Sequence, residues 1–163
     1  MAVNEEIRIK IISELYEVEA SAFTDAEDGE DIFEENKAKD QSDILEINTI
    51  GTLTDDGERI SVSYNETEAS GMDGSVTTIS FLKSYPEMIT MTRDGTVSAT
   101  LVFEDGKRHH CIYKTPFMPF EVGVLTKNVT NSVLQSGLLY IEYIVEIRGA
   151  KAERTKFKLQ ILK

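Results

Sequence analysis

The sequence predicts an all-β protein: a closed or nearly closed antiparallel β-barrel with eight to ten strands and little helix. From Ile44 onward, apolar and polar residues alternate in short runs. Turn residues separate these runs at nearly even spacing: Asp56-Gly57, Asp73-Gly74, Asp94-Gly95, Asp105-Gly106 and Gly137. Glycine adopts positive φ and aspartate tolerates it, so each pair can close a tight hairpin. Because this many short strands exceeds what a flat sheet comfortably holds, closure is favoured.

The expected strands follow the alternation along the chain. The first runs near 6–15, where Ile7, Ile9 and Ile11 share one face. The others are expected at 44–54, 58–67, 76–83, 88–93, 96–103, 107–114, 120–126, 129–134, 138–148 and 154–162. Pro86, Pro116 and Pro119 fall between these runs, where a missing N–H does no harm to a ladder.

An acidic inserted segment, 17–42, follows the first strand. It carries ten Asp or Glu and two Lys, a charge of −8 out of the net −12, which leaves −4 for the rest of the chain. A short helix over 31–39 and a mobile loop are both compatible with its composition. Because its charges repel each other and few apolar groups hold it, we expect it to be the most mobile part and the first site of proteolysis.

Length and composition predict a single domain, 1–163. The net charge of −12 argues against a nucleic-acid partner, because an acidic face repels phosphate. No apolar run is long enough to span a membrane, and the first ten residues have no signal-peptide core, so we expect no membrane partner and a cytoplasmic location. Cys111 has no second cysteine to pair with. Monomer and dimer both remain open.

Several stretches resemble the YwiB-like family, an uncharacterised domain of Gram-positive bacteria. They are ISVSYNE at 60–66, VTTI at 76–79, MTRDGTV at 91–97, YKTPFMPF at 113–120, Thr126, and 137–143. Their order and spacing together carry the resemblance. It implies a fold similar to the calycins, the barrel group of lipocalins and fatty-acid-binding proteins, and it implies no activity. The Gly-x-Trp signature of lipocalins is absent, since the chain has no tryptophan.

Five polar side chains interrupt apolar faces and are the candidate ligand-binding residues. They are Tyr64, Glu66, Arg93, Thr126 and Tyr143. Each continues the phase of an apolar row on its own strand. A charged side chain on a core face needs an opposite charge, water or a bound ligand beside it. One interpretation is that Glu66 and Arg93 form an inward ion pair near one mouth of the barrel. The other is that both side chains are exposed to solvent, because each lies at the end of its strand. Strand-end twist favours the second interpretation, and the first is retained as a hypothesis.

No metal site is predicted. In His109-His110-Cys111 only His109 and Cys111 share a strand face, which is short of the three or four ligands that zinc takes. The acidic segment fails as a calcium loop, because an alignment on Gly29 puts Thr24 and Ala26 where aspartates belong.

No catalytic residues and no cofactor are predicted. The two histidines are adjacent, and the sequence has no nucleophile elbow, phosphate loop or dinucleotide fingerprint. Whether the protein is an enzyme stays uncertain, with a non-enzymatic role favoured.

Two functions remain open. One is a barrel that binds a small, partly apolar ligand in a lumen that also includes Met91 and Phe103. The other is a structural or interaction module with a side-chain-filled interior. In the second, the acidic segment or the 117–120 segment contacts a partner. Phe117 and Met118 beside prolines resemble a docking patch, but we favour their acting as a plug for one end of the barrel.

Overall fold

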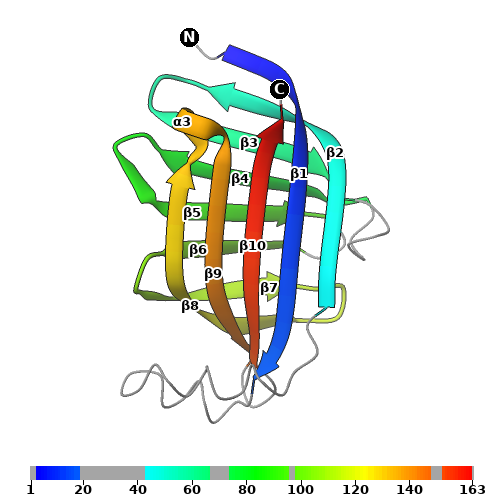
Figure 1. Cartoon of the computed structure of the whole chain (residues 1–163). Coiled ribbons are helices and arrows are strands. Elements are labelled where there is room, and N and C mark those ends of the chain that lie inside the picture. The colour runs from blue at the N-terminus through cyan, green and yellow to red at the C-terminus, as the bar shows by residue number, and fades with distance from the viewer. Residues whose placement is uncertain (1–2, 19–42, 67–73, 96–97, 148–151, 163) are drawn as a thin grey trace.

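The computed structural model is a closed barrel of ten antiparallel strands (Figure 1). It describes residues 3–18, 43–66, 74–95, 98–147 and 152–162. The predicted all-β class and the closed antiparallel barrel are therefore confirmed. The acidic segment 17–42 lies outside the described residues apart from the backbone at its start, so the alternatives of helix and loop stay predictions.

The strands are long at the two chain ends and short in the middle. Their bounds are β1 Val3–Val18, β2 Asp43–Asp55, β3 Arg59–Asn65, β4 Val76–Leu82, β5 Tyr85–Asp94, β6 Ser98–Glu104, β7 Arg108–Lys114, β8 Pro119–Ser132, β9 Leu138–Ile147 and β10 Ala152–Leu162. Within the described ranges there is one short helix, α3 (Val133–Ser136), between β8 and β9.

The barrel closes because β1 pairs on both of its edges. One edge runs against β2, from Val3 opposite Asp55 to Leu15 opposite Asp43. The other edge runs against β10, from Arg8 opposite Leu162 to Val18 opposite Ala152. Every other strand pairs with its neighbours in sequence. This closure removes the free edges that an open sheet would expose.

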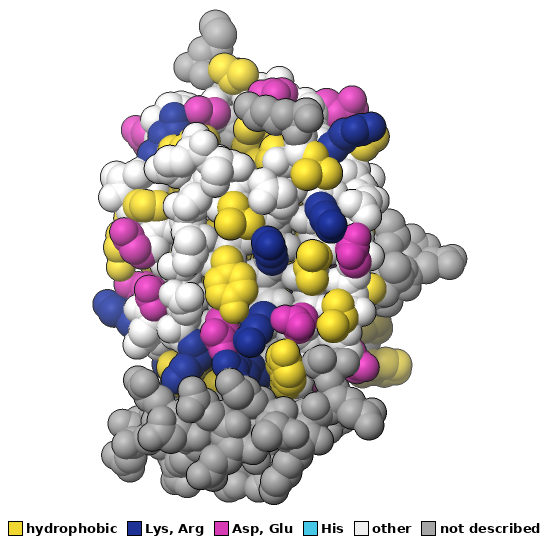
Figure 2. Space-filling model, viewed as in Figure 1, with side chains coloured by type: hydrophobic (Ala, Val, Ile, Leu, Met, Phe, Trp, Pro, Cys, Tyr) yellow, Lys and Arg dark blue, Asp and Glu magenta, His cyan; other side chains and the backbone are white. Residues whose placement is uncertain are grey.

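Side chains alternate between a dry interior and the solvent, as the sequence pattern requires. On β3, Ile60, Val62 and Tyr64 are buried, and the residues between them are more exposed. The core also contains Ile89, Met91 and Phe103, all with no exposed surface. On the outside, Figure 2 shows charged and apolar side chains intermixed over the face formed by β1, β9 and β10.

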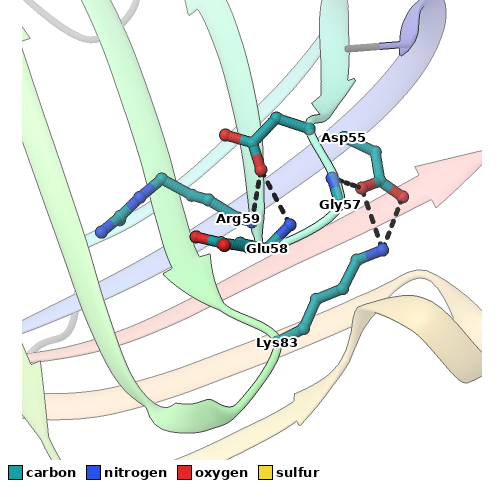
Figure 3. A network of polar contacts seen from close by, with 6 residues as sticks. Asp55, Gly57, Glu58, Arg59 and Lys83 are labelled. Carbon is teal, nitrogen blue, oxygen red and sulfur yellow. Dashed lines mark hydrogen bonds and ion pairs between the residues drawn. The ribbon is translucent and has the colours of Figure 1, made fainter. Parts of the chain in front are cut away.

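The aspartate–glycine turns lie at strand connections, and two mechanisms explain the glycines. Gly57, Gly74 and Gly106 have positive φ, the conformation that favours glycine. Gly95 does not; a Cβ there would instead collide with the side chain of Ser75. At the β2–β3 turn (Figure 3), Asp56 accepts hydrogen bonds from the amides of Glu58 and Arg59, at 2.9 and 2.7 Å.

A second aspartate in this turn joins it to the next hairpin. Asp55 accepts a 2.9 Å hydrogen bond from the amide of Gly57 and pairs with Lys83 at 2.9 Å (Figure 3). Because Lys83 lies between β4 and β5, the pair holds two adjacent turns together at the end of the barrel where both chain termini lie.

Two sequence expectations about strand limits are wrong. The strands expected at 120–126 and 129–134 are one strand, β8, whose register with β9 shifts between Thr126 and Asn128. A bulge absorbs the extra residue there without ending the strand. Pro86 lies inside β5 and Pro119 is the first residue of β8, so neither lies between strands. The carbonyl of Pro86 accepts a 3.0 Å hydrogen bond from the side chain of Asn131.

Candidate functional site

A pocket of about 300 Å³ lies inside the barrel, at the end opposite the chain termini. Its walls come from the ends of β1, β3, β5, β7 and β9, from the middle of β6, and from the beginnings of β2, β8 and β10. The apolar part of the wall includes Leu15, Leu45, Ile47, Leu101, Val145 and Phe157. These residues continue the inward rows of their strands to the point where the barrel is no longer filled by its own side chains.

Glu66 lies within this pocket and is 5% exposed. It follows the last residue of β3 in the phase of Ile60, Val62 and Tyr64. Its Oε2 accepts a hydrogen bond from the hydroxyl of Thr77, which is fully buried on β4. A buried carboxylate needs such donors, since burial alone disfavours its charge. The Thr77 hydroxyl therefore positions one of the two carboxylate oxygens.

Arg93 enters the same pocket from β5. Its backbone pairs with Thr77, so β4 separates it from the strand that carries Glu66. The Nε atom of Arg93 is buried and has no hydrogen-bond partner. Among the described residues no ion pair joins Arg93 to Glu66. The structure thus brings the two charges into one pocket and leaves them apart.

Three tyrosines surround these charges: Tyr64 on β3, Tyr113 on β7 and Tyr143 on β9. Burial raises the pKa of each phenol. The positive charge of Arg93 acts in the opposite sense on all three pKa values, which shows that Arg93 lies within electrostatic reach of each ring. The ring of Tyr143 also packs on Phe103, with 4.4 Å between centroids.

Four of the five candidate residues line the pocket: Tyr64, Glu66, Arg93 and Tyr143. Thr126 is 1% exposed, and its hydroxyl has no hydrogen-bond partner, but it does not line the pocket. Its backbone bonds instead with Gly106 and Lys107, in the turn at the other end of β6 and β7. Met91 and Phe103 are core residues outside the pocket wall, in contrast to the sequence expectation.

The sequence reasoning missed several polar residues of the pocket wall: Ser13, Tyr113, Glu153 and Thr155. A signal for three of them was present. Thr155 and Glu153 continue the inward row of Leu159 and Phe157, but the expected strand began only at 154. Tyr113 likewise continues the phase of the buried Cys111 on β7.

The 117–120 segment does not act as a plug through Phe117, because that side chain is 94% exposed. Met118 beside it is 63% exposed. The turn is ordered by Thr115, whose hydroxyl accepts hydrogen bonds from the amides of Phe117 and Met118, at 3.2 and 3.1 Å. The plug interpretation is wrong for these two residues, and the side chain of Phe120 lies outside the described residues.

A separate polar cluster surrounds Glu104 at the other end of the barrel. Tyr85 donates a hydrogen bond to Glu104, His109 lies 3.0 Å from it, and Lys107 pairs with it at 3.3 Å. The Tyr85 bond, then the His109 bond, lowers the pKa of Glu104 to about 2. Within the described ranges, no group of three or more His, Cys, Asp or Glu side chains could hold a metal ion.

A model of the family described as "Domain of unknown function (DUF1934)" matches residues 31–159. The chain belongs to the DUF1934 family. The match begins before Ile60, where the stretches that resemble the YwiB-like family begin, and so includes β2 and most of the pocket-lining strands.

The DUF1934 chain is also similar to the crystal structure of the ywiB protein from Bacillus subtilis. The two share 15% sequence identity and a TM-score of 0.63, over 97% of this chain and 94% of the other. At this identity the likeness establishes the fold. No curated protein matches the chain significantly. No helix in the described part of the chain is long and apolar enough to cross a membrane.

Proposed function

We propose that this protein binds a small, partly apolar ligand in the pocket of its barrel. One observation carries the proposal: an interior space of about 300 Å³ contains a buried Glu66 and a guanidinium with an unpartnered Nε. Ligand pockets combine apolar walls with a few convergent polar groups, and their volumes start at roughly 300 Å³. A barrel with a purely structural interior gains nothing from charged groups in a space that side chains could fill.

The proposal includes two broader expectations. One is a relationship to the calycins, supported by a closed antiparallel barrel with an interior pocket. The other is a cytoplasmic location, supported by the single Cys111, which has no partner in this chain for a disulfide.

The test is calorimetric titration of the full chain with an uncharged apolar probe, 3-phenylpropan-1-ol. We expect saturable 1:1 binding that is lost when the pocket is filled, in Val145→Phe and separately in Leu15→Trp. Two variants are used because either one alone can disturb folding. Ile50→Trp is the matched control, since Ile50 is 58% exposed and outside this pocket. Binding that survives in both folded pocket variants overturns the proposal.

An interaction module is the second candidate, favoured by the exposed Phe117 and Met118. An apolar pair held out in an ordered turn is typical of a contact surface. If the pair mediates self-association, sedimentation should show a dimer that Phe117→Ser converts to monomer, while probe binding stays unchanged. A monomer in both proteins would argue against this role.

A further inference from the structure

The pocket contains charged groups of both signs. Arg93 contributes the positive charge, and Glu66 and Glu153 contribute negative charges. Within the described residues, no ion pair joins Arg93 to either carboxylate. Glu66 is held by Thr77, and the Nε of Arg93 has no acceptor although it is buried.

Buried donors without acceptors are costly, and buried charges even more so. A ligand that carries one charge satisfies one of these groups and repels the other. An anion at Arg93 faces the field of Glu66, and a cation at Glu66 faces the field of Arg93. A ligand with both charges satisfies both groups and adds no net charge to a low-dielectric site.

The rest of the pocket wall determines the chemical character of the uncharged part of the ligand. Leu45, Ile47 and Leu101 are apolar, and so are Val145 and Phe157. Burial of an apolar substituent against them is the main source of favourable free energy in such a pocket. A volume of about 300 Å³ restricts the ligand to a small molecule.

We propose that the pocket binds a small zwitterion of the amino-acid class with an apolar side chain, its carboxylate on Arg93 and its ammonium group on Glu66. This inference rests on the proposed function, because it names the ligand class of the same pocket. Arg93 supplies the planar donor fork that matches a carboxylate. Thr77 donates to the Oε2 atom of Glu66 and holds the carboxylate at the pocket wall, where it faces the ammonium group.

The test is a titration with probes that share a phenyl ring and differ in charge. The zwitterions are phenylalanine and 4-amino-3-phenylbutanoate, which differ in the distance between their charges. The single-charge probes are 3-phenylpropanoate and phenethylamine, and the uncharged probe is 3-phenylpropan-1-ol. We expect at least one zwitterion to bind tenfold or more tightly than each of the other three probes.

Two substitutions assign the charges. Glu66→Gln keeps an oxygen that can accept from Thr77 and should reduce the affinity of the zwitterion to that of 3-phenylpropanoate. Arg93→Gln should reduce it to that of phenethylamine. Glu121→Gln and Arg8→Gln are the matched controls, because both residues are exposed and outside the pocket, and they should leave all affinities unchanged.

The outcomes separate this inference from the proposed function. If 3-phenylpropan-1-ol or a single-charge probe binds as tightly as both zwitterions, the pocket binds apolar ligands and the zwitterion proposal is overturned. If no probe binds, the proposed function fails as well. A zwitterion preference that persists in both Glu66→Gln and Arg93→Gln would also overturn the assignment of its charges.

Discussion

At the scale of single residues, the alternation along a strand predicts which side chains point into the barrel, but it does not predict their hydrogen-bond partners. Tyr64, Glu66 and Tyr143 are buried, as their phase indicates. The hydrogen bond from Thr77 to Glu66 depends on the pairing of β3 with β4, which phase does not contain. Arg154 is an opposite case. It lies in the outward phase of β10 but is only 8% exposed, where its Nε bonds to Glu142 at 2.7 Å.

The buried tyrosines predict that stability falls at alkaline pH. The pKa values of Tyr64 and Tyr143 are raised in the folded protein, chiefly by burial, above the value of about 10 in an unfolded chain. Below that pH both states are neutral and the full stability is present. Above it the unfolded chain loses protons that the folded protein retains, so the free energy of unfolding decreases as pH rises.

This decrease is measurable by urea unfolding between pH 8 and 11, a range set by the reference pKa of about 10. Each retained proton accounts for at most roughly 1.4 kcal/mol per pH unit. Tyr143→Phe should flatten the decrease, and Tyr16→Phe on the outer face is the comparison. A slope equal in wild type and Tyr143→Phe would show that Tyr143 does not resist ionisation.

At the scale of elements, close approach between strands depends on particular small residues. Gly51 on β2 is buried on the inner face of the barrel, opposite Tyr64 on β3. A Cβ at Gly51 would lie 2.6 Å from the backbone oxygen of Ser63 and 3.1 Å from the side chain of Ile9. Because the first contact is with backbone, a side-chain rotation cannot relieve it.

We therefore expect Gly51→Ala to destabilise the protein by about 1–3 kcal/mol, the usual range for overpacking in a core. Alanine restricts the unfolded chain and so stabilises by roughly 0.4–1 kcal/mol, which the clash exceeds. Thr52→Ala, at an exposed neighbouring position on the same strand, is the control. Unfolding midpoints in urea measure both, and a Gly51→Ala protein as stable as wild type would contradict the close approach.

At the scale of the whole molecule, the barrel wall is not uniform. Among the described residues, β6 and β7 pair only at Ser98 with Lys114 and Ala99 with Tyr113, whereas β1 is paired along most of both edges. An outer depression of about 600 Å³ lies over this junction, and Arg93 lines it as well as the interior pocket. Within the described part of the chain, the shortest ladder of the wall is therefore next to the candidate site.

Hydrogen exchange should reveal this difference. Amides of 100–104 and 108–112 that point across the β6–β7 junction should exchange earlier than the amides of β1, because local opening there breaks fewer ladder hydrogen bonds. Mass spectrometry of peptic peptides, or amide spectra, would measure both sets in one sample. Slower exchange across the junction than in β1 would show that the wall is uniformly stable.

The sequence by itself determined the fold class, most strand positions and the inward direction of the candidate residues. These follow from local causes: the two-residue period of strands and the conformational freedom of glycine at turns. Tertiary structure decided which inward residues share a space. Strand pairing brought Tyr113, Glu153 and Thr155 to Glu66 and Arg93, and it placed Thr126 beside the turn at the opposite end. The register between paired strands determines which inward side chains become neighbours in the pocket. The residue pattern of one strand contains no information about its register with strands far along the chain.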